Sequence, residues 1–96
     1  MLYTGRMTTI HFKPEAHRAL AETYRTDESL SNMYDYNFDL LQADHSDLRV
    51  RRHRHTRDGV DAWHIYVVIP GRPQRYAIIW DEKDGEVWVH YLGPWL

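Results

Sequence analysis

The hydrophobic pattern of the chain changes its period once, near Leu48, and this change limits the fold more than any other feature. Before Leu48, apolar positions recur at i, i+3, i+4, i+7, i+8 and i+11, which is typical of an amphipathic helix. These positions are Leu30, Met33, Tyr34, Asn37, Phe38 and Leu41. After Leu48, apolar and polar residues alternate, which is typical of strands with one buried face. A helical half followed by a β half predicts a two-layer α+β domain.

Local signals divide the first half into a strand and two helices. The segment "TTIHF" (8–12) is a short strand candidate, and Pro14 suits the first turn of a helix, where its missing N–H costs nothing. The segment "RTDES" (25–29) predicts a break, with Thr26 or Asp27 as the cap of a second helix. The spacing therefore predicts a helical hairpin that follows a strand.

The second half reads as a series of strands separated by turns. "LRVRRHR" alternates loosely, and the later strands are predicted at 62–69, 75–80 and 87–92. Turns are expected at Asp58 and Gly59, at "PGRPQ" (70–74) and at "DEKDGE" (81–86). We therefore expect one domain, 1–96, in which an N-terminal strand and a two-helix hairpin pack on a four- or five-stranded antiparallel sheet.

Composition limits the class of protein. The chain has 96 residues, 43% of them hydrophobic and 27% charged, which fits one globular domain and not a disordered chain. It has no cysteine, which favours a reducing compartment. It contains no apolar run of signal-peptide or transmembrane kind. The expectation is a cytoplasmic protein with no membrane partner, and the oligomeric state stays open.

Charge is distributed unevenly along the chain. Residues 1–48 carry eight acids and four bases, whereas residues 49–96 carry six acids and eight bases. The segment 49–57 alone has five arginines and two histidines. Arginines bind phosphates through two parallel hydrogen bonds and stack on unpaired bases, so this run is a candidate RNA-contacting surface. The alternative is a basic edge strand in water, where arginines discourage pairing between sheets.

The alternation also assigns side chains to faces of the sheet. In 87–92 it places Val87, Val89 and Tyr91 on one face of the strand and Trp88, His90 and Leu92 on the other. The more apolar set of each strand is expected to pack under the helices. The opposite face is then expected to carry His64, Tyr66, Arg75, Trp88 and His90.

These residue types suit phosphodiester cleavage without a metal. One imidazole can take the proton of a ribose 2′-OH, a second group can protonate the leaving 5′-oxygen, and an arginine can stabilise the charged intermediate. His53 and His55 have the H-x-H spacing of metal ligands, but their neighbours are arginines, which disfavour a bound cation. No metal and no cofactor are expected.

Three stretches resemble the RelE/ParE superfamily of bacterial toxins: "FKPEAHRAL" (12–20), "WHIYVVIPG" (63–71) and "RYAIIWDEKDGEVWVHYLG" (75–93). The resemblance implies a RelE/ParE-like fold and a toxin of a type II toxin–antitoxin system. Members of this family inhibit translation by cleaving mRNA on the ribosome, or inhibit DNA gyrase, and a cognate antitoxin holds each inactive. In that context the basic run is also a candidate dock for an acidic antitoxin.

The chain departs from the family at the usual site. His64 and Tyr66 stand where RNA-cleaving relatives carry lysines or arginines, and Ala77 stands at an arginine position, with Arg75 two residues earlier on the same face. After Gly93 the sequence reads "PWL", without the family's basic and aromatic pair.

Two hypotheses follow. The first is a metal-independent endoribonuclease that inhibits translation by acting on mRNA, on the ribosome or off it. Its candidate catalytic residues are His64, Tyr66, Arg75 and His90, and its candidate RNA-binding residues are Arg49, Arg51, Arg52, Arg54 and Trp88. The second is a diverged, non-enzymatic member of the same fold that binds a protein partner, either an antitoxin or gyrase.

Overall fold

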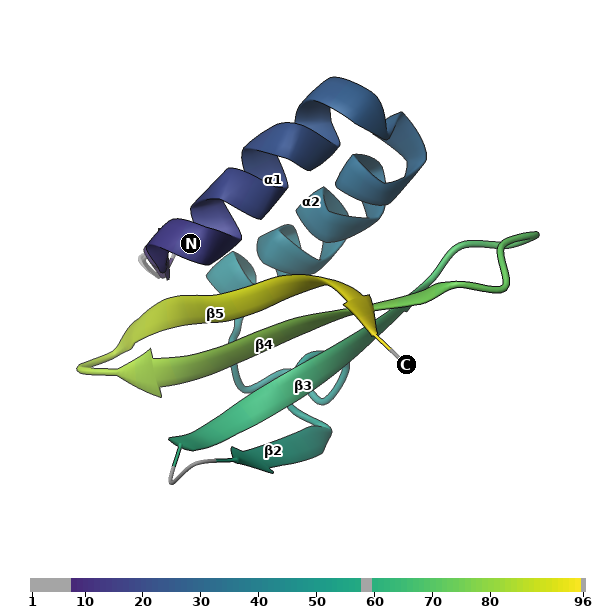
Figure 1. Cartoon of the computed structure of the whole chain (residues 1–96). Helices are drawn as coiled ribbons and strands as arrows, with labels where there is room; N and C mark the ends of the chain where they lie inside the picture. Colours follow the sequence, from purple (N-terminus) through teal and green to yellow (C-terminus); the bar gives the residue numbers. More distant parts are fainter. Residues whose placement is uncertain (1–7, 58–59, 96) are drawn as a thin grey trace, which may run out of the picture.

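The computed structural model describes residues 8–57 and 60–95 of the chain. Two helices lie on one face of a five-stranded sheet (Figure 1). The elements in chain order are β1 (Ile10–Phe12), α1 (Pro14–Thr26), α2 (Glu28–Ala43), β2 (His53–Arg57), β3 (Val60–Val68), β4 (Arg75–Lys83) and β5 (Glu86–Trp95). The predicted α+β class with a helical hairpin is confirmed. The turn predicted at Asp58 and Gly59 lies outside the described residues.

The two helices begin and end where the sequence signals predict. Pro14 occupies the first turn of α1, whose N-cap residue has no side-chain hydrogen bond. Asp27 ends α1 by donating its backbone N–H to the Thr23 carbonyl. The same residue caps α2, because its Oδ1 accepts a hydrogen bond of 3.2 Å from the backbone N–H of Leu30. Of the two cap candidates, Asp27 therefore caps α2, while Thr26 donates its hydroxyl back to Glu22.

The strand order is β1-β5-β4-β3-β2, and the sheet is mixed. The pairs β2–β3, β3–β4 and β4–β5 are antiparallel, but β1 pairs with β5 in parallel, with Ile10 opposite Val87. The prediction of a wholly antiparallel sheet is therefore wrong at this pair. A hairpin turn forces antiparallel pairing, whereas β1 is followed by two helices, and such a long connection permits a parallel partner.

The core lies between the helices and the sheet face beneath them. The helices contribute Ala16, Leu20, Leu30, Tyr34, Phe38 and Leu41, and the strands contribute Ile65, Val67, Ile78, Trp80, Val87, Val89 and Leu92. The faces predicted for β3 and β4 are confirmed, since Ile65, Ile78 and Trp80 are buried in this core. Neither of the two described helices is long and apolar enough to cross a membrane.

A β-bulge in β5 changes the faces predicted for its second half. Ile79 pairs with Tyr91, but the next residue, Trp80, pairs with Val89, so His90 is an extra residue. From this point the alternation shifts by one position. Leu92 therefore joins the core, with 2% of its surface exposed, and Tyr91 lies on the opposite face. The predicted faces of both residues are wrong for this reason.

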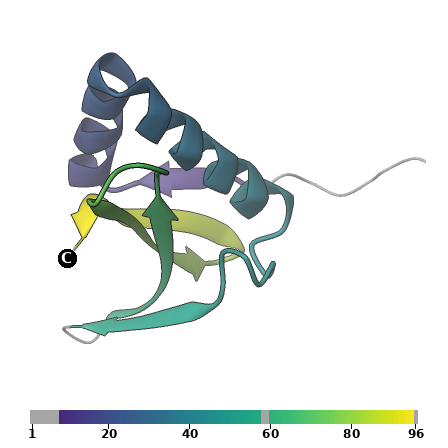
Figure 2. The ribbon, with the colours of Figure 1, turned by 90° about the vertical axis from the view of Figure 1, so that its right-hand side faces the viewer.

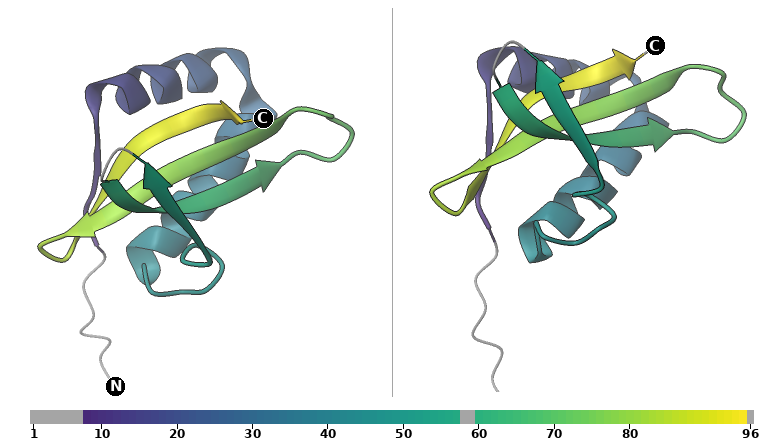
Figure 3. Two further views of the ribbon diagram at one scale, coloured as in Figure 1. Left: turned by 60° about the horizontal axis from the view of Figure 1, so that its bottom comes forward. Right: turned by 90° about the horizontal axis from the view of Figure 1, so that it is seen from below.

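The sheet curls strongly, so that β2 crosses the face that carries no helix (Figures 2 and 3). We name this the open face. The His55 ring on β2 lies 5.9 Å from the Trp95 ring on β5, although β3 and β4 separate the two strands in the sheet. The curl covers the middle of the open face with aromatic rings. Ala77 and Ile79, which belong to that face, are consequently buried.

Candidate functional site

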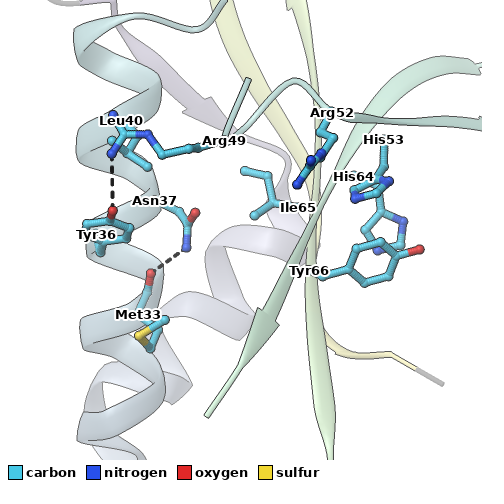
Figure 4. Close-up of a pocket in the computed structure, with 10 residues that line it drawn as sticks. All are labelled: Met33, Tyr36, Asn37, Leu40, Arg49, Arg52, His53, His64, Ile65 and Tyr66. Atoms are coloured by element: carbon cyan, nitrogen blue, oxygen red, sulfur yellow. Dashed lines mark hydrogen bonds between the residues drawn. The ribbon is translucent and has the colours of Figure 1, made fainter. Parts of the chain in front are cut away.

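A cleft of about 360 Å³ opens between α2 and the edge of β3, and we name it the edge cleft (Figure 4). It gathers two arginines, two imidazoles and two phenols over an apolar floor that includes Met33 and Ile65. The ionisable groups are Tyr36, Arg49, Arg52, His53, His64 and Tyr66. Four of these six, Arg49, Arg52, His64 and Tyr66, are candidates that the sequence predicts.

The edge cleft exists because β2 is shorter than β3. The pairing of the two strands runs from Arg57 with Val60 to His53 with His64. Beyond His64, no described strand pairs with the outer edge of β3, and α2 lies beside that edge. The first residue of β2 and the last paired residue of β3 thus place two imidazoles next to each other at the mouth of the cleft.

His64 is the most enclosed polar group of the cleft. Only 5% of its surface is exposed, and its Nε2 is buried without a hydrogen-bond partner among the described residues. The ring stacks on Tyr66 at 4.2 Å and meets the edge of Trp95 at 4.8 Å. Burial lowers the pKa of His64, and the charges of His55 and His53 lower it further. The imidazole is therefore neutral near pH 7 and can accept a proton.

His53 is the exposed counterpart of His64. It lies directly across the strand pair from His64, and its ring meets the edge of Tyr66 at 5.1 Å. Residues directly opposite on an antiparallel pair have Cα atoms roughly 4.5–5.5 Å apart. Both imidazoles therefore lie against the Tyr66 ring.

The two arginines of the cleft differ in their partners. Arg49 binds Asp47 at 2.8 Å and also reaches the Tyr36 hydroxyl at 3.5 Å. The hydrogen bond from Arg49 lowers the pKa of Asp47, so that carboxylate stays ionised and holds the guanidinium. Arg52 is exposed and makes no ion pair with any described residue. Arg52 is therefore the cation that remains available to an anionic ligand.

Two other arginines of the basic run, Arg51 and Arg54, lie away from the cleft. Arg51 donates to the His45 carbonyl at 2.9 Å and to Glu82 at 3.2 Å, and its guanidinium lies 5.3 Å from the Trp80 ring. Arg54 pairs with Asp61 and lies 5.1 Å from the Trp63 ring. Both side chains cover tryptophans and are already paired with carboxylates.

Two further catalytic candidates, Arg75 and His90, share the open face but do not meet. Arg75 begins β4, opposite Val68 and Trp95. His90 Nε2 lies 3.0 Å from Asp81 Oδ2, in ion-pair range but not aligned for a hydrogen bond. Six residues separate Arg75 from Asp81 along β4, which corresponds to about 20 Å. The structure therefore brings His64 and Tyr66 together and leaves Arg75 and His90 at opposite ends of the sheet.

Trp88 also lies apart from the cleft, at the β1 side of the sheet. Its ring stacks on His11 with centroids 4.4 Å apart, and Lys13 Nζ lies 4.9 Å from its centre. His11 Nε2 in turn lies 3.1 Å from Glu86. This group of side chains is separate from the imidazoles of the edge cleft.

Two of the six ionisable groups of the cleft, His53 and Tyr36, were not among the predicted catalytic or RNA-binding residues. The sequence pattern offers His53 only as a metal ligand together with His55. The described residues contain no group of three or more His, Cys, Asp or Glu side chains placed to hold a metal ion. Tyr36 lies on the polar side of α2 and is 52% exposed. A large aromatic residue outside the apolar period of a helix is the signal that could have identified it.

Comparisons of the chain with protein-family models, with curated proteins and with solved structures find no match. The proposals below therefore rest on the residues and their geometry.

Proposed function

We propose that the protein is a toxin-like inhibitor of translation that cleaves mRNA in the edge cleft without a metal ion. The observation that carries this proposal is the pairing of a buried, neutral His64 with an exposed His53, beside Arg52, which has no ion-pair partner among the described residues. The layout of two helices on one face of a sheet is compatible, at a coarse level, with the RelE/ParE resemblance.

The chemistry assigns one role to each group. Neutral His64 takes the proton of a ribose 2′-OH, and the 2′-oxygen then attacks the neighbouring phosphorus. His53, in its protonated form, gives a proton to the 5′-oxygen as the P–O5′ bond breaks. Arg52 stabilises the negative charge that develops on the phosphoryl oxygens. The products are a 2′,3′-cyclic phosphate and a 5′-hydroxyl, so no outside reactant is required.

The remaining side chains of the cleft suit an unpaired RNA strand. Tyr36 and Tyr66 are 52% and 45% exposed, and their rings lie at the cleft. Unstacked bases of single-stranded RNA bind to such aromatic rings, whereas paired bases do not expose their faces. The cleft therefore favours single-stranded mRNA over duplex RNA.

The test compares cleavage of ribosome-bound and free mRNA by the wild type and by matched histidine variants. His64→Gln and His53→Gln should each lower the cleavage rate roughly 10²–10⁴-fold, because each removes an acid–base group. His17→Gln is the control, since His17 is exposed on α1 and away from the cleft. A chelator should have no effect. Full activity in both cleft variants would exclude this assignment of the site.

A second candidate function, binding of a protein partner without catalysis, is favoured by the outer edge of β3. On the side away from β4, the segment from Ile65 to Val68 has no described strand beside it, and 53% of the Val68 surface is exposed. An extended segment can add to such an edge as a further strand, and Arg52 would favour an acidic one. The candidate partner is a cognate antitoxin, and gyrase is the alternative target.

The two functions can be separated with one further variant. Val68→Lys should weaken binding of the antitoxin, taken as the protein encoded by the neighbouring reading frame. The lysine places a charge on the edge of β3 where the antitoxin strand would pair. The same change should leave RNA cleavage intact, because Val68 does not line the cleft. If the wild type cleaves no RNA and Val68→Lys abolishes partner binding, the binding function replaces the ribonuclease.

A further inference from the structure

A second groove, of about 430 Å³, lies between β1, α1 and α2, and we name it the helix groove. On α2 it is lined by Asp35, Phe38, Asp39 and Gln42, which are three or four residues apart and so share one face. The edge cleft is lined by a different set on α2, including Met33 and Tyr36. The helical period places the two sets on opposite sides of α2, so the two sites are separate.

The floor of the helix groove is apolar. Phe12 of β1 and Phe38 of α2 meet edge to face, with ring centroids 5.3 Å apart. Ile10 and Leu20 complete the floor. Ile10 and Phe12 pack against the core yet are only partly buried. The groove therefore leaves apolar surface in contact with water, and covering it would be favourable.

The rim of the helix groove is acidic. Asp35 and Asp39 are one turn apart on α2, and both side chains line the groove. Tyr24 of α1 faces them and donates its hydroxyl to Asp35 Oδ1. Burial raises the pKa of Tyr24 to about 12, together with the hydrogen bond to Asp35 and the charge of Asp39. The phenol therefore stays protonated and keeps donating to Asp35.

No cation of the described chain neutralises this rim. Among the residues described, no Lys, Arg or His nitrogen lies within 4.0 Å of Asp35 or Asp39 in an ion pair. By contrast, the Asp27 carboxylate, which caps α2, has a counterion, because Arg72 lies 2.7 Å from it. The groove thus combines uncovered apolar surface with two carboxylates that have no counterion among the described residues.

We infer that the helix groove binds a basic, apolar segment of a partner protein. A lysine or arginine of that segment pairs with Asp35 and Asp39, and a neighbouring aliphatic or aromatic side chain covers Phe12 and Phe38. A phosphate or an acidic segment would meet like charge at this rim. A purely apolar ligand would remove the two carboxylates from water without a partner, which costs free energy. Only a segment with both features satisfies the groove.

The inference is tested with the full chain and a capped synthetic peptide, Lys-Leu-Phe-Lys-Leu, by titration calorimetry. Asp35→Asn combined with Asp39→Asn should weaken its binding roughly three- to tenfold, as expected for the loss of partly exposed ion pairs. Glu28→Gln is the matched control, because it removes one charge from α2 outside the groove. Gln42→Arg should also weaken binding, since it places a cation three residues from Asp39.

The site of binding is checked separately. The amide NMR shifts of Leu20 and Phe38 and the methyl shifts of Leu20 should move on addition of the peptide, while the amide shifts of the edge-cleft residues stay fixed. A second peptide, Glu-Leu-Phe-Glu-Leu, should not bind. Equal binding of both peptides, or unchanged binding by the Asp35→Asn and Asp39→Asn double variant, would overturn the inference. Because RNA cleavage is measured in the other cleft, this result and the fate of the ribonuclease proposal are independent.

Discussion

The titration of His64 makes both the proton transfer proposed for the edge cleft and the stability of the fold depend on pH. Its pKa is lowered in the folded protein, by burial first and then by the charges of His55 and His53. The unfolded chain therefore binds the proton more readily than the native state does. The contribution of His64 to the free energy of unfolding is greatest above the ordinary histidine pKa of 6.5, and this contribution falls as the pH drops below that value.

We therefore predict that acidification destabilises the wild type more than a variant without this imidazole. Urea unfolding of the wild type and of His64→Phe, at pH 7.5 and at pH 5.5, measures the difference. The wild type should lose more of its free energy of unfolding between the two pH values. The other histidines are common to both proteins and serve as an internal control. Equal losses would mean that His64 titrates normally in the fold.

The sequence predicts some residue positions in the site and not others. The alternation of β3 placed His64 and Tyr66 on one face, and the two rings do stack. It could not place Tyr91 or Leu92, because the bulge in β5 leaves no mark on a pattern of period two. It could not bring Trp95 to His64 either, since that contact depends on the curl of the sheet.

Among the elements, Asp27 joins three segments, through its backbone N–H and its carboxylate. It ends α1, caps α2, and accepts two hydrogen bonds from Arg72, of 2.7 and 2.9 Å, in the turn between β3 and β4. The hydrogen bonds from Arg72, and then that from Leu30, lower the pKa of Asp27. The stabilisation is therefore present above the ordinary carboxyl pKa of 3.8 and is lost as the pH falls through the lower folded value.

Two substitutions separate the cap from the ion pair. Asp27→Asn keeps an oxygen for the Leu30 N–H but removes the charge that pairs with Arg72, so it should lower Tm at pH 7. Asp27→Ala removes both and should lower Tm further. Thermal unfolding followed by circular dichroism gives the order. Below pH 3.8 the gap between wild type and Asp27→Asn should shrink; a gap that persists in acid would show that the charge is not its cause.

The elements themselves were largely predictable. Both helices, their break, and β3, β4 and β5 lie where periodicity and turn residues place them. The partner of β1 was not predictable, because no local signal distinguishes a neighbour joined by a turn from one reached across two helices. Arg49, Arg51, Arg52 and Arg54 look alike in sequence, and only the packing of Trp63 and Trp80 separates the two that cover tryptophans.

Over the whole molecule, Trp80 connects the sheet to the segment that follows α2. It is fully buried, and its Nε1 donates a hydrogen bond of 3.0 Å to the carbonyl of Val50, which is also buried. Arg51 then lies over the same ring. The core thus holds the start of the basic run in place, and through it the position of Arg52 and His53.

Trp80→Phe should lower the free energy of unfolding by about 2–3 kcal/mol, because it leaves the Val50 carbonyl without its donor and reduces the buried ring. Trp88→Phe is the control and should cost less than about 1 kcal/mol, since Trp88 is only partly buried and makes no such hydrogen bond. Urea unfolding measures both. Equal costs would mean that the Trp80 hydrogen bond contributes nothing to stability.

The parallel pairing of β1 with β5 has a consequence for synthesis. The ribosome delivers β1 among the first described residues and β5 among the last, at 5–20 residues per second, so β1 waits about 4–15 s for its partner. During that interval the helices have apolar faces but no complete sheet to cover. The nascent chain then exposes apolar surface of the kind that chaperones bind, and the β1–β5 pair can form only after translation of β5.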